Sequence, residues 1–171
     1  PSATTAAPRI EPHHLSLFEQ PTPRGDFAGL AEVRRNVKPV IMADDMAFDL
    51  ADARELAHHK ACDLISVYPG KNGGIRKSRQ IVEFAEQHGM ACSIGSNLEL
   101  DVCTAAMAHL VVASRNMQVE KYPGDMLGPS YHEFPIVKDP LKIEGPFTTL
   151  SDKPGLGVEV DWAVVEKNPL K

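Results

Sequence analysis

The sequence predicts an α/β fold in which short parallel strands alternate with helices. Apolar runs of strand length recur between longer segments whose apolar residues have helical spacing. With 43% hydrophobic and 24% charged residues, the composition is that of a globular domain and excludes a collagen-like or disordered chain. Parallel strands need a crossover connection, which is usually a helix. The alternation therefore favours a parallel sheet covered by helices.

The first two strand and helix pairs lie before residue 62. LSLF at 15–18 is the first predicted strand, and the apolar spacing of FAGLAEVRRNV at 27–37 predicts the first helix. PVIMA at 39–43 is the second predicted strand. The segment DLADARELAHHKA that follows is predicted to form a helix with its apolar side against the sheet.

Three more strands and two more helices are predicted before residue 121. The strands are expected at 63–68, 90–94 and 116–120. The helices are expected at 75–89 and 98–114, and Gly89 is a typical C-terminal stop. PGKNGG at 69–74 is predicted as a loop, and the chain from Tyr122 onward as an extended cover rich in Pro and Gly.

Two architectures combine parallel strands with helices. A doubly wound dinucleotide-binding sheet should carry GxGxxG between its first strand and helix, and no segment here does. A (β/α) TIM-type barrel takes about 250 residues, whereas this chain has 171 and about five units. The sequence therefore predicts that residues 1–121 are the C-terminal half of such a barrel, with residues 1–12 as the rear half of a helix.

Charge and composition restrict the expected partners. A net charge of -5 argues against a protein that binds nucleic acid by neutralising phosphates. No run of 18 apolar residues and no signal peptide is present, so we expect no membrane partner and a cytoplasmic location. Cys62, Cys92 and Cys103 form no CxxC pair, and we expect reduced thiols. The expected partner is a small molecule.

Polar residues stand at the ends of four predicted strands. They are Glu19, Asp44, Lys71 and Asn97. Because the active site of a β/α barrel forms at the carboxyl ends of its strands, two carboxylates and an amine would meet there. This set suits a hard divalent cation beside a general base. The alternatives are helix N-caps or loop ion pairs for the two acids and a solvated loop lysine for Lys71.

Four motifs in the same order resemble the enolase superfamily, and most closely its muconate lactonizing (muconate cycloisomerase) subgroup. They are FEQPTP at 18–23, MADD at 42–45, PGKNGGI at 69–75 and PGLGVEVD at 154–161. The resemblance implies a capping domain, a modified barrel and a C-terminal segment that returns to the cap. Residues 122–171 are then expected to hold the last strand region and that segment, with the cap outside this chain.

The resemblance also implies roles for individual residues. Glu19 and Asp44 match the second and third carboxylate ligands of Mg²⁺. Asp45 matches the acid that follows the third ligand and interacts with the ligands rather than with the metal. Lys71 matches the base on the sixth barrel strand, with Asn72 in a supporting position beside it. The first metal ligand and a second lysine are expected on strands that lie upstream of Pro1.

The remaining implied roles concern the substrate. Gly73 and Asn97 are expected to lie beside it. An acid from the last strand should contact the substrate carboxylate or its metal-bound oxygen, and Glu120 in QVEKYP competes for this role with Asp125 in GDMLGP. The motif favours Asp125, whereas Glu120 is nearer to the predicted strand end.

The implied reaction is Mg²⁺-dependent removal of a proton α to a substrate carboxylate, through an enediolate that the metal stabilises. An isomerase is expected, either a cycloisomerase or a racemase or epimerase. The mandelate racemase subgroup is disfavoured, because SIGSNLELD after the seventh strand contains no His. Two alternatives stay open: an acid-sugar or hydroxy-acid dehydratase, and a non-catalytic half-barrel that needs a partner segment. The expected partners are a small carboxylate substrate, the upstream segment and a second copy of the protein.

Overall fold

The computed structural model describes residues 14–168, so the helix predicted within residues 1–12 lies outside the described residues. The strands are β1 (Leu17–Glu19), β2 (Val40–Ala43), β3 (Leu64–Val67), β4 (Ala91–Ile94), β5 (Lys142–Glu144) and β6 (Phe147–Thr149). The helices are α2 (Phe27–Asn36), α3 (Leu50–His59), α4 (Pro69–Asn72), α5 (Ile75–Gln87), α6 (Asp101–Ala113) and α7 (Trp162–Lys167), with a 3-10 turn, η2 (Gly128–Tyr131).

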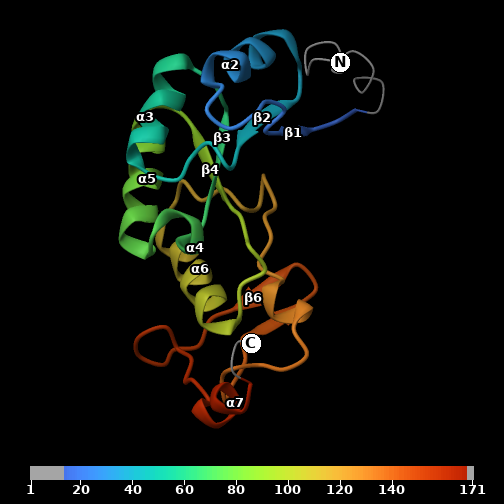
Figure 1. Cartoon of the computed structure of the whole chain (residues 1–171), viewed down its shortest axis with the longest axis vertical. Coiled ribbons are helices and arrows are strands. Elements are labelled where there is room, and N and C mark those ends of the chain that lie inside the picture. The colour runs from blue at the N-terminus through green and yellow to red at the C-terminus, as the bar shows by residue number, and fades with distance from the viewer. Residues whose placement is uncertain (1–13, 169–171) are drawn as a thin grey trace.

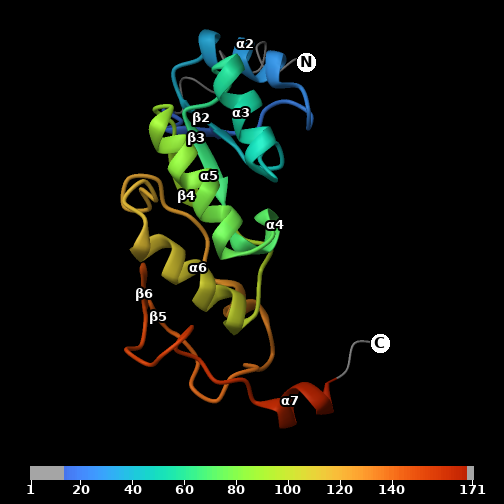
Figure 2. The ribbon, with the colours of Figure 1, turned by 90° about the vertical axis from the view of Figure 1, so that its left-hand side faces the viewer.

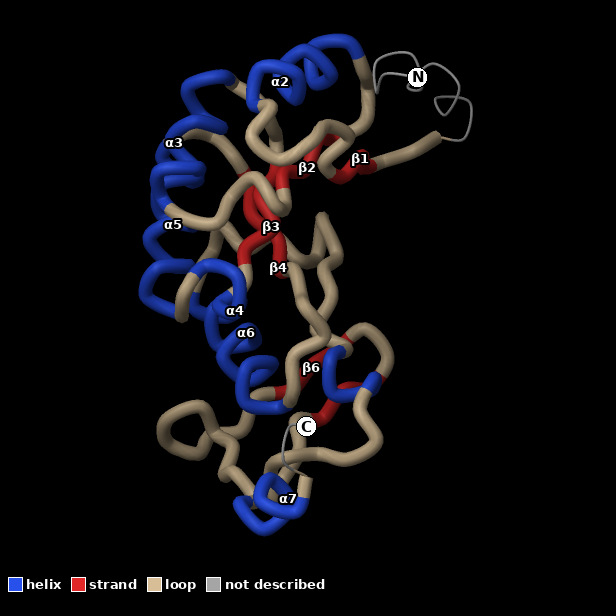
Figure 3. Tube along the Cα trace, viewed as in Figure 1, coloured by secondary structure: helices blue, strands red, loops and turns tan. Residues whose placement is uncertain are grey.

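The first four strands form one parallel sheet in the order β1-β2-β3-β4. Helices α2, α3 and α5 lie along one side of this sheet, and α6 continues their row toward the C-terminal segment (Figures 1 and 2). Coloured by secondary structure, the chain shows the same separation of helices from strands (Figure 3). The predicted alternation of parallel strands and helices is confirmed. All four carboxyl ends therefore meet at one edge.

An apolar core holds the sheet and the helices together, and capping side chains define where two of the helices begin. Ile41, Ile65 and Leu56 are among its fully buried side chains, and each contributes about 1.5–3 kcal/mol by its burial. Asp26 begins α2 by accepting a hydrogen bond from the Gly29 N–H. Asp49 begins α3 in the same way, which satisfies amide groups that have no partner within the helix.

Two predicted elements differ from the structure. The predicted loop at 69–74 contains the short helix α4, because Pro69 stands at its first position, where no N–H is needed, and Gly73 ends it with φ +76°. The predicted fifth strand is reduced to a single parallel bridge between Cys92 and Met117. Past this bridge the amides of Lys121 and Tyr122 donate to the Gln118 carbonyl and turn the chain away from the sheet.

The segment from Tyr122 onward is more structured than an extended cover. It contains η2, the antiparallel β5–β6 hairpin and α7, and Val137 pairs with Val160. The buried Asp101 carboxylate accepts a hydrogen bond from the Ile136 N–H and so attaches the segment to the start of α6. The longest helices of residues 14–168, α5 and α6, have 13 residues each, too short to cross a bilayer.

Candidate functional site

A cavity of about 320 Å³ lies at the carboxyl ends of the four parallel strands. Its lining includes three carboxylates, from Glu19, Asp44 and Asp125. Three serines also line it: Ser66, Ser93 and Ser96. Glu19 is the last residue of β1, Asp44 directly follows β2, and Asp125 comes from the segment after the Met117 bridge. The cavity is therefore acidic and lined by many oxygen atoms that could bind a metal ion.

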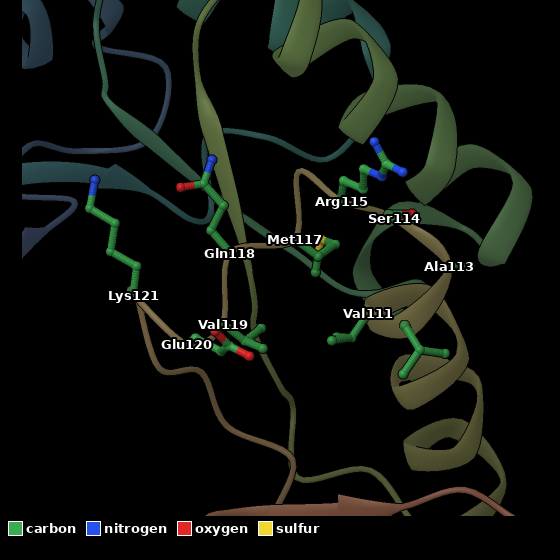
Figure 4. Close-up of a pocket in the computed structure, with 10 residues that line it drawn as sticks. Val111, Ala113, Ser114, Arg115, Met117, Gln118, Val119, Glu120 and Lys121 are labelled. Carbon is green, nitrogen blue, oxygen red and sulfur yellow. The ribbon is translucent and has the colours of Figure 1, made fainter.

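The other predicted acid lies elsewhere. Glu120 lines a separate cavity, between the end of α6 and the segment that follows it (Figure 4). That cavity contains no residue of the strand ends. Of the two acids that the sequence left in competition, the structure brings only Asp125 together with Glu19 and Asp44.

Lys71 lies beside Asp44 and is almost completely buried. Its Nζ lies 2.7 Å from Asp44 Oδ1, 2.8 Å from the Asp44 carbonyl and 2.8 Å from the Ser66 carbonyl. The Lys71 side chain is 1% exposed, whereas that of Asp44 is 25% exposed. The amine also lies 4.6 Å from the centre of the Tyr68 ring. The alternative that Lys71 is a solvated loop lysine is therefore wrong.

The position of Lys71 is fixed by its neighbour Asn72. The Asn72 Oδ1 accepts from the Tyr68 N–H at 3.0 Å, and its Nδ2 donates to the carbonyls of Ala47 and Phe48 at 2.8 and 3.0 Å. These bonds join α4 to the loop that follows β2. Lys71 therefore lies on a short helix that is hydrogen-bonded to the loop containing Asp44.

Burial and charge perturb the ionisable groups of the site. Burial raises the pKa of Glu19, and the nearby Asp44 charge raises it further, while Lys71 opposes this. Burial lowers the pKa of Lys71, against the opposite effect of the Asp44 carboxylate. Burial also raises the pKa of Tyr68, with added contributions from Asp44 and Asp45. The two metal-ligand candidates therefore repel each other, and Lys71 provides the compensating charge.

The remaining predicted residues lie at or near this edge in different ways. Asp45 is exposed and acts on the site through its charge. Gly73 faces the Lys77 side chain rather than the cavity. Asn97 is exposed, and its Oδ1 accepts a hydrogen bond from the Tyr68 hydroxyl at 3.3 Å. Neither Gly73 nor Asn97 lines the cavity with the carboxylates.

Three residues of this edge were missed by sequence reasoning. Ser66 lines the cavity, and Tyr68 lies under the Lys71 amine. Alternation along a strand places residues two apart on one face, so a serine and a tyrosine within DLISVY could have indicated the inward face. Glu99, predicted as part of the helix start, instead accepts hydrogen bonds from Ser96 Oγ and the Asn97 N–H.

The donor set fits part of a magnesium site. Mg²⁺ is commonly held by one or two carboxylates, with waters and substrate oxygens completing its shell. Glu19 and Asp44 supply two such groups on one cavity. Partial burial and then the Asp44 charge raise the pKa of Glu19, and a bound cation would relieve the repulsion between the two carboxylates. Within residues 14–168, no cluster of three or more His, Cys, Asp or Glu side chains forms a complete site.

Comparison with known proteins gives consistent matches along the chain. Residues 1–164 match the family model described as enolase C-terminal domain-like. The chain is 32% identical to muconate cycloisomerase 1 of Rhodococcus opacus over 165 residues, which cover 96% of this chain and 43% of that protein. It is 35% identical to an L-Ala-D/L-Glu epimerase of Clostridium acetobutylicum over 145 residues, 85% of this chain and 39% of that protein.

Solved structures match as well. The 2-chloromuconate cycloisomerase from Rhodococcus opacus 1CP superposes with a TM-score of 0.90 at 28% identity, over 96% of this chain and 44% of that one. The L-Ala-D/L-Glu epimerase from Bacillus subtilis gives a TM-score of 0.84 at 30% identity, over 91% of this chain and 43% of that one. The chain thus spans less than half the length of these relatives.

Proposed function

The chain belongs to the enolase C-terminal domain-like family, as its four motifs predicted. Because its relatives include isomerases, we propose that the chain contributes the part of an isomerase active site that binds the metal ion and transfers the proton. The proposed reaction is Mg²⁺-dependent removal and return of a proton α to the carboxylate of a small substrate. The observation that supports it most directly is the convergence of Glu19, Asp44 and Asp125 on one cavity beside Lys71.

Glu19 and Asp44 would hold the Mg²⁺ ion. When bound, the ion supplies a Lewis acid that stabilises the negative charge of an enediolate. Asp125 is proposed to lie against the substrate. Its Oδ1 accepts a hydrogen bond from the Leu127 N–H, which fixes the direction of the carboxylate at the cavity wall. The serine hydroxyls of the lining can donate to substrate oxygens.

Lys71 is the predicted base, and that role stays a prediction. To accept a proton, the amine needs a free lone pair directed at the substrate. The three N–H bonds of a lysine ammonium match the three oxygen acceptors found here, so the amine would have to lose a proton and turn away from Asp44. Burial favours the neutral amine, since it lowers the pKa of Lys71.

The proposal is tested by α-proton exchange. The whole protein is incubated in deuterated buffer with Mg²⁺ and a pool of small carboxylates that includes muconate, L-Ala-L-Glu and hydroxy acids, and exchange is followed by NMR. We expect exchange that EDTA and Asp44→Asn abolish and that Asp139→Asn, at an exposed carboxylate, leaves unchanged. No exchange across the pool would contradict the proposal and favour a non-catalytic barrel portion.

Product analysis separates the two enzymatic alternatives. An isomerase returns the proton or closes a ring, whereas a dehydratase releases water and leaves a keto acid. The isomerase is preferred because muconate cycloisomerases and an L-Ala-D/L-Glu epimerase are relatives at more than 30% identity. The cytoplasmic location and the homo-oligomeric state stay predictions.

A further inference from the structure

The ion pair between Lys71 and Asp44 is built differently from the other Lys–Asp pair of the described residues. Lys153 and Asp139 lie 2.6 Å apart, but their side chains are 58% and 71% exposed. At the strand ends the lysine is 1% exposed and the aspartate 25% exposed. An exposed pair contributes little to stability, whereas removal of one partner of a buried pair leaves an uncompensated charge.

Asp44 is the carboxylate that is hydrogen-bonded to Lys71, and the charges of Asp45 and Glu19 also favour its ammonium form. Its amine contacts two main-chain carbonyls, of Asp44 and Ser66, and a single carboxylate oxygen, Asp44 Oδ1. The Tyr68 ring, 4.6 Å away, covers another side of it. The Asn72 hydrogen bonds attach α4 to the loop after β2, and this attachment places the Lys71 ammonium beside Asp44.

Asp44 is placed by the same contacts. Its N–H donates to Gln20 Oε1 at 2.9 Å, its carbonyl accepts from Lys71, and one carboxylate oxygen is bonded to the ammonium. The side chain keeps partial exposure toward the cavity that Glu19 also lines. The Glu19 and Asp44 carboxylates repel each other, and the charge of Lys71 opposes this repulsion.

We propose that Lys71 has a positioning role beside its predicted role as the base: in its charged form it is an internal counter-ion that holds the Asp44 carboxylate at the cavity and with which a divalent cation must compete. The inference rests on the proposed function only where it treats Asp44 as a metal ligand. The stabilising role of the pair does not depend on any reaction.

The first experiment measures thermal unfolding of the whole protein in EDTA. Lys71→Met keeps the length of the side chain and removes its charge, and we expect the Tm to fall by about 6–12 °C. The matched control Lys153→Met removes the lysine of the exposed pair and should leave the Tm unchanged. The double variant Asp44→Asn/Lys71→Met should lose much less than the sum of the two single changes.

Additive effects, or a Lys71→Met variant as stable as Lys153→Met, would overturn the proposal. If Lys71→Met alone gives no folded protein, the double variant decides. A folded double variant supports the proposal, because it lacks both charges, and an unfolded one refutes it.

The second experiment separates a positioning role from a merely structural one. Binding of Mg²⁺ alone is measured by calorimetry for the wild type, Lys71→Met and Lys153→Met. Removing a competing positive charge should tighten binding by about tenfold in Lys71→Met and leave Lys153→Met unchanged. Unchanged or weaker binding in Lys71→Met would refute the competition. These measurements need no substrate, so failure of the proposed isomerase reaction would appear only in the exchange assay.

Discussion

Asp44 and Asp125 line the same cavity, although Asp44 directly follows β2 and Asp125 lies far along the chain, after α6. The segment that carries Asp125 reaches the cavity because Ser93 Oγ donates to the Tyr122 carbonyl at 2.6 Å. The bridge at Met117 brings the preceding residues alongside β4. Two separate contacts therefore place this acid at the cavity that Glu19 and Asp44 also line.

This placement predicts different outcomes for the two competing acids. Asp125→Asn keeps the shape of the side chain and removes its charge, and we expect it to lower turnover by about 10²-fold or more, as for loss of a positioned acid or base. Glu120→Gln should leave turnover unchanged, because its cavity is separate. The measurement is the rate of α-proton exchange with the substrate found in the pool. Equal losses in both variants would contradict the assignment.

A substitution at Gly124 should displace Asp125 from the cavity without changing its side chain. A Cβ at Gly124 would lie 2.0 Å from the Ile94 carbonyl oxygen, so any larger residue must push the segment away from β4. We expect Gly124→Ala to lower turnover as well as stability. Gly29→Ala is the control, since its Cβ would lie 2.1 Å from Asp26 Oδ2 at the start of α2, outside the cavity lining. If the two variants lose turnover equally at matched stability, the position of Asp125 is not what matters.

Asn72 predicts a stability effect at the base of the site. Asn72→Ala leaves the Tyr68 N–H and the carbonyls of Ala47 and Phe48 without their side-chain partner. Because Asn72 is buried, we expect the free energy of unfolding in urea to fall by about 3 kcal/mol. Asn36→Ala removes an exposed bond to the Glu32 carbonyl and should cost less than about 0.5 kcal/mol. Similar losses in both would contradict this account.

The sequence predicts the four strands and the residues at their ends because periodicity is a local property. Glu19 and Asp44 follow apolar runs, and a parallel sheet brings such ends together without further information. The contacts of Lys71 are not local, since they depend on Asn72 binding the loop after β2. The shortened fifth strand depends on a turn formed after Gln118. Its composition gave no sign that pairing would stop at one bridge.

The buried thiol of Cys62 should make the free energy of unfolding depend on pH in the alkaline range. Burial raises the pKa of its thiol from 9.0 to about 12. The folded state therefore keeps this proton at pH values where the unfolded chain has lost it, so the contribution of Cys62 is complete below pH 9 and declines as the pH rises toward 12. The decline is about 1.4 kcal/mol per pH unit within that window. Urea unfolding of wild type and Cys62→Ala between pH 7 and 11 measures it. The difference between the two proteins should be constant up to pH 9 and then shrink, because alanine has no proton to lose, and a constant difference up to pH 11 would show that the buried thiol ionises as easily as an exposed one.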